Sequence, residues 1–248
     1  MVIGTNQLSA LALALALCAP GLSGCEGPAP RPALQRRAIV NGTPSSPAFL
    51  PAVGAVTMDQ PSSYYLRCTG TLIAPDLVLT AAHCFEGLPA STLHGFYRGH
   101  DLAQDDDPVR RWVPAKRVLV HPSYKGGAAP GGLATYYDIA LVELVHGAGL
   151  RPLPLLAPAE APTLLVQDAP ALMVGYGQTV ALSKPSSGTR HQGETRVKQV
   201  GSHEFSLVGG GSAPNKCVGD SGGPSLLDAD AGAGRSWRVA GVASRAGA

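Results

Sequence analysis

Three stretches of the sequence contain residue types that together could carry out nucleophilic catalysis. Ser221 lies in Gly219–Pro224, whose glycines let the backbone approach a bound group closely and leave N–H groups unobstructed. A serine hydroxyl is a weak nucleophile unless a base is positioned beside it. His83 could be that base, because imidazole titrates near neutral pH. Asp138, which opens the run Asp138–Leu141, could accept a hydrogen bond from the imidazole and hold it in one tautomer.

Each of the three residues also has a plainer interpretation. The serine could cap a glycine-rich turn, and a solitary histidine is usually structural or solvated. The aspartate could simply begin a strand, since the run Asp138–Leu141 is a weak signal when it stands alone. The surrounding sequence therefore has to decide between catalysis and structure.

The surrounding sequence resembles the trypsin/chymotrypsin family of serine peptidases. Gly219–Pro224 is similar to the nucleophile loop of that family, and Gly70–Cys84 is similar to the strand and turn that carry its histidine. Val120–Tyr124 is similar to the segment that approaches its aspartate. The order His, Asp, Ser is also the order of this family, and not that of subtilisins or α/β-hydrolases. In outline the resemblance covers Ile39–Ser244.

This resemblance implies a serine endopeptidase that works through an acyl-enzyme. Ser221 would attack a peptide carbonyl while His83 takes its proton, and Asp138 would fix the tautomer and stabilise the imidazolium. The backbone N–H groups of Gly219 and Ser221 would form the oxyanion hole. The implied partners are a protein or peptide substrate, and no cofactor is needed.

A fourth stretch, Ile39–Gly42, resembles the mature N-terminus of the family. There, proteolysis frees an isoleucine α-ammonium, which is buried against the aspartate beside the nucleophile. Here the pair would be Ile39 and Asp220, and losing one member of such a pair costs roughly 3–5 kcal/mol. The resemblance therefore implies a zymogen and an activating protease. Ala38 stands where trypsin-like activators require arginine, so we expect another cleavage specificity or a second trimming step.

The resemblance also assigns the cysteines and the specificity pocket. Cys68 and Cys84 match the disulfide that braces the histidine loop, whereas Cys217 matches a cysteine whose usual partner lies further downstream and is missing here. The specificity pocket would include Asn215, Lys216 and Ser244. Because a neutral amide at Asn215 supplies no negative charge, we expect no strong preference for Arg or Lys in the substrate.

The elements that must position these residues are short strands. The chain has 248 residues, 45% of them hydrophobic, with 31 Gly and 22 Pro, which suits many turns between strands. No long helical pattern competes with the strand-like runs, and many such runs at regular spacing are typical of barrels or sandwiches. The strand-like runs include 50–56, 70–73, 77–80, 117–120, 139–145, 171–174, 205–208 and 238–243.

With the family resemblance, these runs predict an all-β fold of two antiparallel β-barrels of the six-stranded type. The barrels would span roughly 39–123 and 138–248, with the triad in the cleft between them. Residues 126–132, 183–194 and 209–214 are predicted loops. Because the family usually continues beyond Ser244 with a last strand and a C-terminal helix, we expect a peptidase domain at 39–248 that is incomplete at its C-terminus.

The N-terminus is a predicted targeting segment. The run 8–19 is apolar and too short to span a bilayer, as in a signal peptide over residues 1–25. Leu22–Cys25 resembles a bacterial lipoprotein signal in which Cys25 is lipidated, although an ordinary secretory signal with an incidental cysteine fits as well. The Pro-rich segment 26–38 is a predicted pro-segment or linker.

These features place the protein in the extracytoplasmic space. We expect a secreted protein of the bacterial type, or an outer-membrane lipoprotein before activation, with the lipid anchoring only the precursor. Once residues 1–38 are set aside, basic and acidic residues balance, so a nucleic-acid partner is not expected. No His spacing typical of a metal site occurs. The alternative function is a non-catalytic homologue that acts as an extracytoplasmic binding lipoprotein.

Overall fold

The computed structural model describes residues 39–58, 65–89, 92, 94–102, 104–127, 131–133, 135–178, 188–230 and 234–245. The predicted signal peptide, the pro-segment and Cys25 lie outside the described residues. Within the described ranges, no helix is both long enough and apolar enough to cross a membrane.

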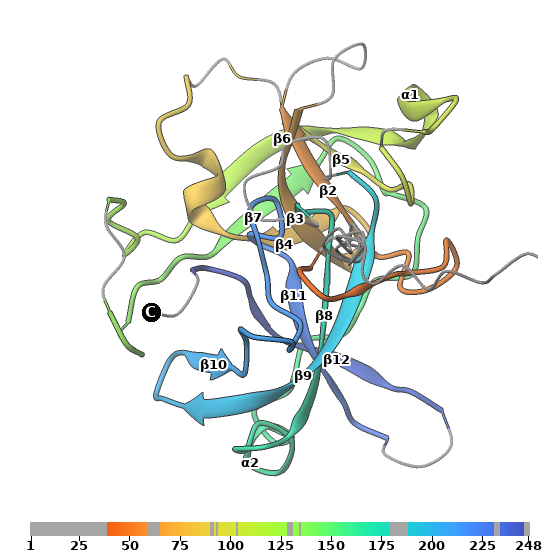
Figure 1. Cartoon of the computed structure of the whole chain (residues 1–248). Coiled ribbons are helices and arrows are strands. Elements are labelled where there is room, and N and C mark those ends of the chain that lie inside the picture. The colour runs from red at the N-terminus through yellow and green to blue at the C-terminus, as the bar shows by residue number, and fades with distance from the viewer. Residues whose placement is uncertain are drawn as a thin grey trace, which may run out of the picture. The chain divides into compact units, whose positions relative to one another are not determined.

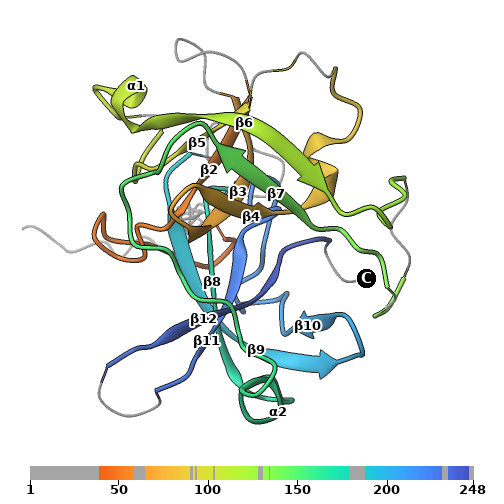
Figure 2. The same ribbon diagram turned by 180° about the vertical axis from the view of Figure 1, so that it is seen from behind.

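Six antiparallel strands close into a first barrel (Figures 1 and 2). Along the barrel wall their order is β2-β3-β4-β7-β6-β5. Apolar side chains at alternate positions fill the interior, as in β7, where Ala140, Val142 and Leu144 are buried. The strands are β2 (Val53–Met58), β3 (Tyr65–Ala74), β4 (Leu77–Thr80), β5 (His94–Tyr97), β6 (Trp112–Val120) and β7 (Ala140–Leu144).

A second antiparallel sheet has the order β1-β9-β8-β11-β12, with β10 paired to the C-terminal part of β9. Its strands are β1 (Thr43–Pro44), β8 (Pro170–Gly175), β9 (His191–Val200), β10 (Phe205–Leu207), β11 (Pro224–Asp228) and β12 (Trp237–Val242). Helices are limited to single turns in the described residues, namely η1 (Ala82–Phe85), α1 (Pro108–Arg111) and α2 (Ala161–Leu164). The predicted all-β class, with a closed barrel and a second sheet, is confirmed.

The predicted division of the chain between the two sheets is wrong in two places. Strand β7 follows Asp138, yet it pairs with β4 and β6 and closes the first barrel. Strand β1, close to the start of the described chain, pairs with β9 in the second sheet. Asp138 therefore lies at the entrance to a strand of the first barrel, not of the second, because the apolar face of β7 packs into the core of the first barrel.

Two features join the barrel to the second sheet. A shared apolar cluster places Val53 and Leu79 of the barrel against Leu172 and Leu226 of the second sheet. Arg190, which directly precedes β9, is only 1% exposed, and its guanidinium is satisfied by oxygens from the segment that leads into β2. It donates to Ser45 Oγ and to the carbonyls of Ser46, Pro47, Leu50 and Val53.

The predicted disulfide is confirmed. Cys68 in β3 and Cys84 in η1 are bonded to each other, and both are buried. The bond closes a sequence separation of 16 residues and holds the turn of His83 against the barrel wall. Among the described residues, Cys217 is a free cysteine.

Replacing the disulfide with a Cys68→Ala, Cys84→Ala double variant should lower the free energy of unfolding by about 3 kcal/mol, because the unfolded chain regains loop entropy. The melting temperature should fall by roughly 6–12 °C for a domain of this size. Thermal unfolding followed by circular dichroism measures the change. Cys217→Ala removes a thiol without breaking a bond and is the control. If the double variant had the same melting temperature as the wild type, the disulfide would contribute nothing to stability.

Candidate active site

Two of the predicted site residues are hydrogen-bonded directly to each other. His83 projects from η1, and its Nδ1 lies 2.7 Å from Oδ2 of Asp138. The backbone N–H of His83 also donates to Oδ1 of Asp138, at 2.9 Å. Since an ionised carboxylate only accepts hydrogen bonds, the proton of the neutral imidazole is on Nδ1. The lone pair of Nε2 is then the basic position of the ring.

The carboxylate of Asp138 is kept ionised by its neighbours. Its side chain is 2% exposed, and burial raises the pKa of the carboxyl group. Hydrogen bonds from the His83 ring, the Ser244 hydroxyl and the His83 backbone outweigh burial, so the pKa lies below its usual value. The Ser244 hydroxyl donates to Oδ2 over 2.6 Å. Asp138 thus remains an acceptor at neutral pH.

The loop that carries Ser221 is held by Thr69 of β3. Thr69 is fully buried, its N–H donates to the carbonyl of Ser221 at 2.8 Å, and its hydroxyl donates to the carbonyl of Gly219 at 2.8 Å. The N–H of Gly222 donates to Ala243 at 2.8 Å, which ties the other side of the loop to the end of β12. A strand of the barrel and a strand of the second sheet therefore fix the loop of Ser221 together.

Two N–H groups of this loop point away from the protein donors that bind the neighbouring carbonyls. The carbonyl of Val218 accepts from Gln178 N–H at 2.7 Å, and that of Asp220 accepts from Gly223 N–H at 2.9 Å. In a trans peptide the N–H points opposite to the carbonyl. The N–H groups of Gly219 and Ser221 belong to these two peptide units and have no acceptor among the described residues. They are available to a bound oxygen atom.

Glycine is required where the loop meets the histidine turn. Gly222 has φ +76°, and a Cβ there would lie 2.0 Å from Thr80 Oγ1 and 2.6 Å from the Thr69 carbonyl. It would also lie 2.8 Å from the backbone nitrogen of Ala81, two residues before His83. This contact brings the residue after Ser221 against the segment that leads into η1.

The predicted pair of Ile39 and Asp220 is also brought together. Both residues are fully buried, and the backbone N–H of Ile39 hydrogen-bonds to the Asp220 carboxylate. Gly177 N–H and Cys217 N–H donate to the same carboxylate, at 2.8 and 2.9 Å. Burial raises the pKa of Asp220, and these donors only partly counteract the rise.

The residues predicted for the specificity pocket take separate positions. Asn215 is exposed, and its N–H donates to the carbonyl of Val40 at 3.0 Å. The Lys216 ammonium donates to the backbone that follows Ser221, namely to the Gly223 and Pro224 carbonyls at 3.0 and 3.1 Å. Ser244 is bonded to Asp138, as described above.

Residues beyond the sequence prediction brace the segment before Asp138. Arg245 forms an ion pair with Glu204, with Nη2–Oε2 at 2.6 Å, and donates to the carbonyl of Gly132 at 2.8 Å. Glu204 also accepts from the N–H of Tyr136 at 3.1 Å. Thr69, Glu204 and Arg245 show no motif in the sequence, because each acts on residues far away in the chain.

Ser244→Ala should lower kcat/KM on the order of tenfold, since it removes a hydrogen bond to a charged group. It should also raise the pKa of Asp138 towards its unfolded value. A carboxyl group whose pKa is depressed on folding stabilises the fold above its unfolded pKa, and this contribution is lost as the pH falls. The acid-unfolding midpoint should therefore move to higher pH. An unchanged acid transition would contradict this role, and Ser46→Ala, at an exposed serine, is the control.

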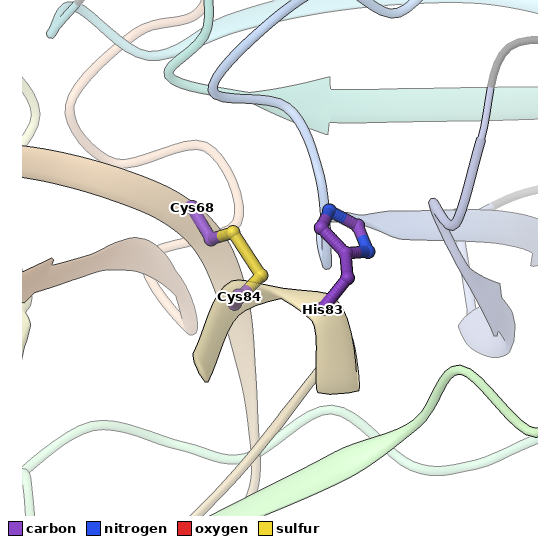
Figure 3. Close-up of side chains that lie close together, drawn as sticks. All are labelled: Cys68, His83 and Cys84. Atoms are coloured by element: carbon purple, nitrogen blue, oxygen red, sulfur yellow. A yellow bond between two sulfur atoms is a disulfide. The ribbon is translucent and has the colours of Figure 1, made fainter. Parts of the chain in front are cut away.

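Cys68, His83 and Cys84 lie close enough together for their ligand atoms to approach a common point (Figure 3). The two sulfur atoms are bonded to each other, and a disulfide offers no thiolate to a metal. Figure 3 shows the His83 ring projecting from the turn that carries this disulfide. The disulfide in this cluster thus supports the turn that carries His83.

A cavity of about 930 Å³ lies elsewhere, against the second sheet. Its lining includes Leu164, Leu227 and Trp237, and none of the predicted catalytic residues contributes to it. The catalytic chemistry and this cavity are therefore separate features.

Comparison with known proteins gives the same family over most of the chain. The trypsin family matches residues 39–247. Bovine chymotrypsin-like elastase family member 1 is 29% identical over 203 residues, which cover 75% of this chain and 72% of the relative. Bovine chymotrypsin-C is 27% identical over 239 residues, covering 90% of this chain and 83% of the relative.

The rat chymotrypsin-like elastase family member 1 is 31% identical over 180 residues, covering 65% of this chain and 63% of the relative. The matched range begins at Ile39, where the described structure also begins, and includes the strands of both sheets. The chain belongs to the trypsin family and is a serine-type endopeptidase.

Proposed function

We propose that Ser221, His83 and Asp138 form the catalytic triad of this endopeptidase. The observation that carries the proposal is the pairing of a buried, ionised Asp138 with Nδ1 of His83, 2.7 Å away. Beside it lies a loop in which the N–H groups of Gly219 and Ser221 have no acceptor within the part of the chain that the structure describes. The Asp138–Nδ1 bond leaves Nε2 as the proton acceptor. The contact of Gly222 with Thr80 and Ala81 keeps the nucleophile loop against the turn of that histidine.

In the proposed reaction the Ser221 oxygen bonds to the carbonyl carbon of the scissile peptide, and its proton passes to Nε2 of His83. The carbonyl oxygen becomes an oxyanion and accepts hydrogen bonds from Gly219 N–H and Ser221 N–H. His83 then protonates the leaving amine, and the C–N bond breaks. Water hydrolyses the acyl-enzyme by the same route in reverse, which regenerates the Ser221 hydroxyl.

An organophosphonate probe tests this assignment. It should attach covalently to the chain, and peptide mapping should place the adduct on Ser221. A folded protein that the probe does not modify would contradict the proposal and favour the non-catalytic homologue instead.

We propose further that cleavage before Ile39 produces the mature enzyme from a precursor. Ile39 has φ +49°, a conformation that is unfavourable for a β-branched residue and costs about 1–3 kcal/mol. Cleavage removes the preceding carbonyl, which relieves this strain and converts an amide into an ammonium beside Asp220. N-terminal sequencing of the active form should give Ile-Val-Asn-Gly, and an active form that begins only at Cys25 would exclude this cleavage.

Secretion is part of the same proposal. A buried disulfide fits an oxidising, extracytoplasmic location. We propose export by the signal peptide, with a lipid on Cys25 that anchors the precursor but not the form that begins at Ile39. Cell fractionation should find the precursor with the membranes and the shorter form in the soluble extracytoplasmic fraction. A membrane-bound form that begins at Ile39 would contradict the proposal.

The substrate is proposed to be a protein or peptide without an Arg or Lys requirement at the scissile bond. Asn215 carries no charge, and the charge of Lys216 is taken up by backbone carbonyls. Hydrolysis of peptide anilides ending in Ala, Leu, Phe, Arg or Lys measures the side-chain preference. A marked preference for Arg or Lys would overturn the proposal.

A further inference from the structure

The short segment Ala243–Arg245, which directly follows β12, links the loop of Ser221 to Asp138. Ala243 forms two backbone hydrogen bonds, of 2.8 and 2.9 Å, to the residues that follow Ser221. The hydroxyl of the next residue, Ser244, donates to Oδ2 of Asp138 at 2.6 Å. One segment therefore contacts both the loop of the proposed nucleophile and the proposed triad carboxylate, so its position affects both.

Arg245 is the far anchor of this segment. Its guanidinium forms two hydrogen bonds to the Glu204 carboxylate, Nη1–Oε1 at 3.2 Å and Nη2–Oε2 at 2.6 Å. Nη2 also donates to the carbonyl of Gly132 at 2.8 Å, and the guanidinium lies over the ring of Tyr136, 5.5 Å from its centroid. A bidentate pair of this kind fixes the orientation of the arginine as well as its distance. Both side chains of the pair are only 20% exposed, so water competes with the contact less than at an open surface.

Glu204 also holds the chain on the other side of Asp138. Its Oε1 accepts the N–H of Tyr136 at 3.1 Å, and Tyr136 stands two residues before Asp138 in the chain. The hydroxyl of Tyr136 donates to the carbonyl of Gly127 at 2.8 Å, which fixes the far end of the same side chain. The ion pair therefore contacts the chain before Asp138 directly, and its arginine is the backbone neighbour of the serine that donates to Asp138.

The carboxylate of Asp138 depends on this outer support. Among the described residues its donors are the ring and backbone of His83 and the hydroxyl of Ser244. Ser244 is thus the donor that comes from outside the histidine turn. If Arg245 released its end of the segment, Ser244 would lose the distance and angle that a hydrogen bond to a charged group requires.

We propose that the ion pair of Glu204 and Arg245 positions the carboxylate of Asp138 from both sides. It holds the preceding chain through Tyr136, and it holds the hydroxyl that donates to the carboxylate through Ser244. This inference rests on the proposed catalytic triad. Among the described contacts neither side chain is bonded to the triad itself, so both are positioning residues whose effect on catalysis passes through these two neighbours.

A double-variant cycle between Arg245 and Ser244 tests the inference, because such a cycle isolates the coupling between two residues. Every variant is made in the full chain with Ala38→Arg, so that immobilised trypsin cleaves directly before Ile39 and is then removed. Mass spectrometry confirms the N-terminus. Arg245→Met, Ser244→Ala and the double variant are compared with the reference protein in kcat and KM for a peptide anilide ending in Leu, and in the rate of phosphonate labelling.

Arg245→Met should lower kcat by about three- to tenfold and leave KM within about twofold, because it misplaces the groups that orient the triad and not those that bind substrate. The labelling rate should fall in parallel with kcat. In the Ser244→Ala background the same substitution should cost less than about twofold, since the hydroxyl through which Arg245 acts is already absent.

Two conservative variants keep the test decisive if Arg245→Met does not fold. Arg245→Lys keeps the charge without the bidentate contact, and Glu204→Gln keeps an acceptor for the N–H of Tyr136 without the charge. Each should lower kcat by about two- to fivefold, and each loss should disappear in the Ser244→Ala background.

Arg238→Met is the matched control. Arg238 of β12 forms an ion pair with Glu160 over 2.9 Å, and the two side chains are 22% and 29% exposed, close to the exposure of the Arg245 pair. Glu160 directly precedes α2, away from the triad. Loss of this pair should lower the melting temperature about as much as Arg245→Met does, yet kcat should stay within about twofold of the reference protein.

The outcomes separate this inference from the proposed function. If Arg245→Met keeps the kcat of the reference protein while its melting temperature falls as in the control, the ion pair is only structural and the inference is wrong. If the losses of Arg245→Met and Ser244→Ala multiply in the double variant, Arg245 does not act through Ser244 and the inference is again wrong. If the reference protein is not labelled at Ser221, the proposed function itself fails.

Discussion

Ser221→Ala is expected to lower kcat by about 10⁴- to 10⁶-fold, the loss seen when a triad nucleophile is removed. The substitution deletes the only atom that forms the covalent bond to the substrate. The N–H groups of Gly219 and Ser221 remain, because Thr69 still holds the backbone of the loop through the carbonyls of Gly219 and Ser221. Some acceleration over water should therefore persist through the oxyanion hole.

The measurement is hydrolysis of a peptide anilide together with phosphonate labelling. The probe should not label Ser221→Ala. Its melting temperature should stay within about 1–2 °C of the wild type, because in a domain of this size a loss of 1 kcal/mol in unfolding free energy lowers the melting temperature by roughly 2–4 °C. Ser46→Ala, at an exposed serine, should behave as the wild type. If Ser221→Ala still turned over substrate at a tenth of the normal rate, another nucleophile would be responsible.

Asp138→Asn is expected to lower kcat by about 10⁴-fold at neutral pH, the size of loss known for a triad carboxylate turned into an amide. Both carboxylate oxygens of Asp138 accept hydrogen bonds, one from the backbone of His83 and the other from its ring and from Ser244. An amide has one accepting oxygen and one donating NH₂ group. The NH₂ group facing Nδ1 would favour the tautomer with its proton on Nε2, and His83 could no longer accept the proton of Ser221.

A pH profile of kcat/KM distinguishes this mechanism from general damage. The variant should show an altered profile because the imidazolium of His83 has lost its neighbouring negative charge. Asp168→Asn is a matched control, since Asp168 is exposed, lies beyond α2 and has φ +63°, which asparagine tolerates. A loss of less than tenfold in a well-folded Asp138→Asn protein would remove Asp138 from the triad.

Strands with an apolar pattern were predictable from the sequence, and polar strands were not. The expected runs at 77–80, 171–174 and 238–243 correspond closely to β4, β8 and β12. Residues 191–194, expected to be loop, begin the ten-residue strand β9. This strand is mostly polar, and it forms because β8 and β10 supply hydrogen-bonding partners on its two sides. Such pairing partners leave no periodic signal in a single sequence.

The sequence was sufficient for the residue types of the site, their order along the chain, the all-β class and the Cys68–Cys84 pair. Their contacts depend on the folded chain. The hydroxyl of Ser244 reaches Asp138 across a sequence separation of 106 residues, and that of Thr69 reaches Gly219 across 150. Hydrogen bonds of this kind form only when two sheets bring distant backbones together, and local propensity carries no information about them. For the same reason, the hydrogen bonds of the Lys216 ammonium to the carbonyls of Gly223 and Pro224 became visible only in three dimensions.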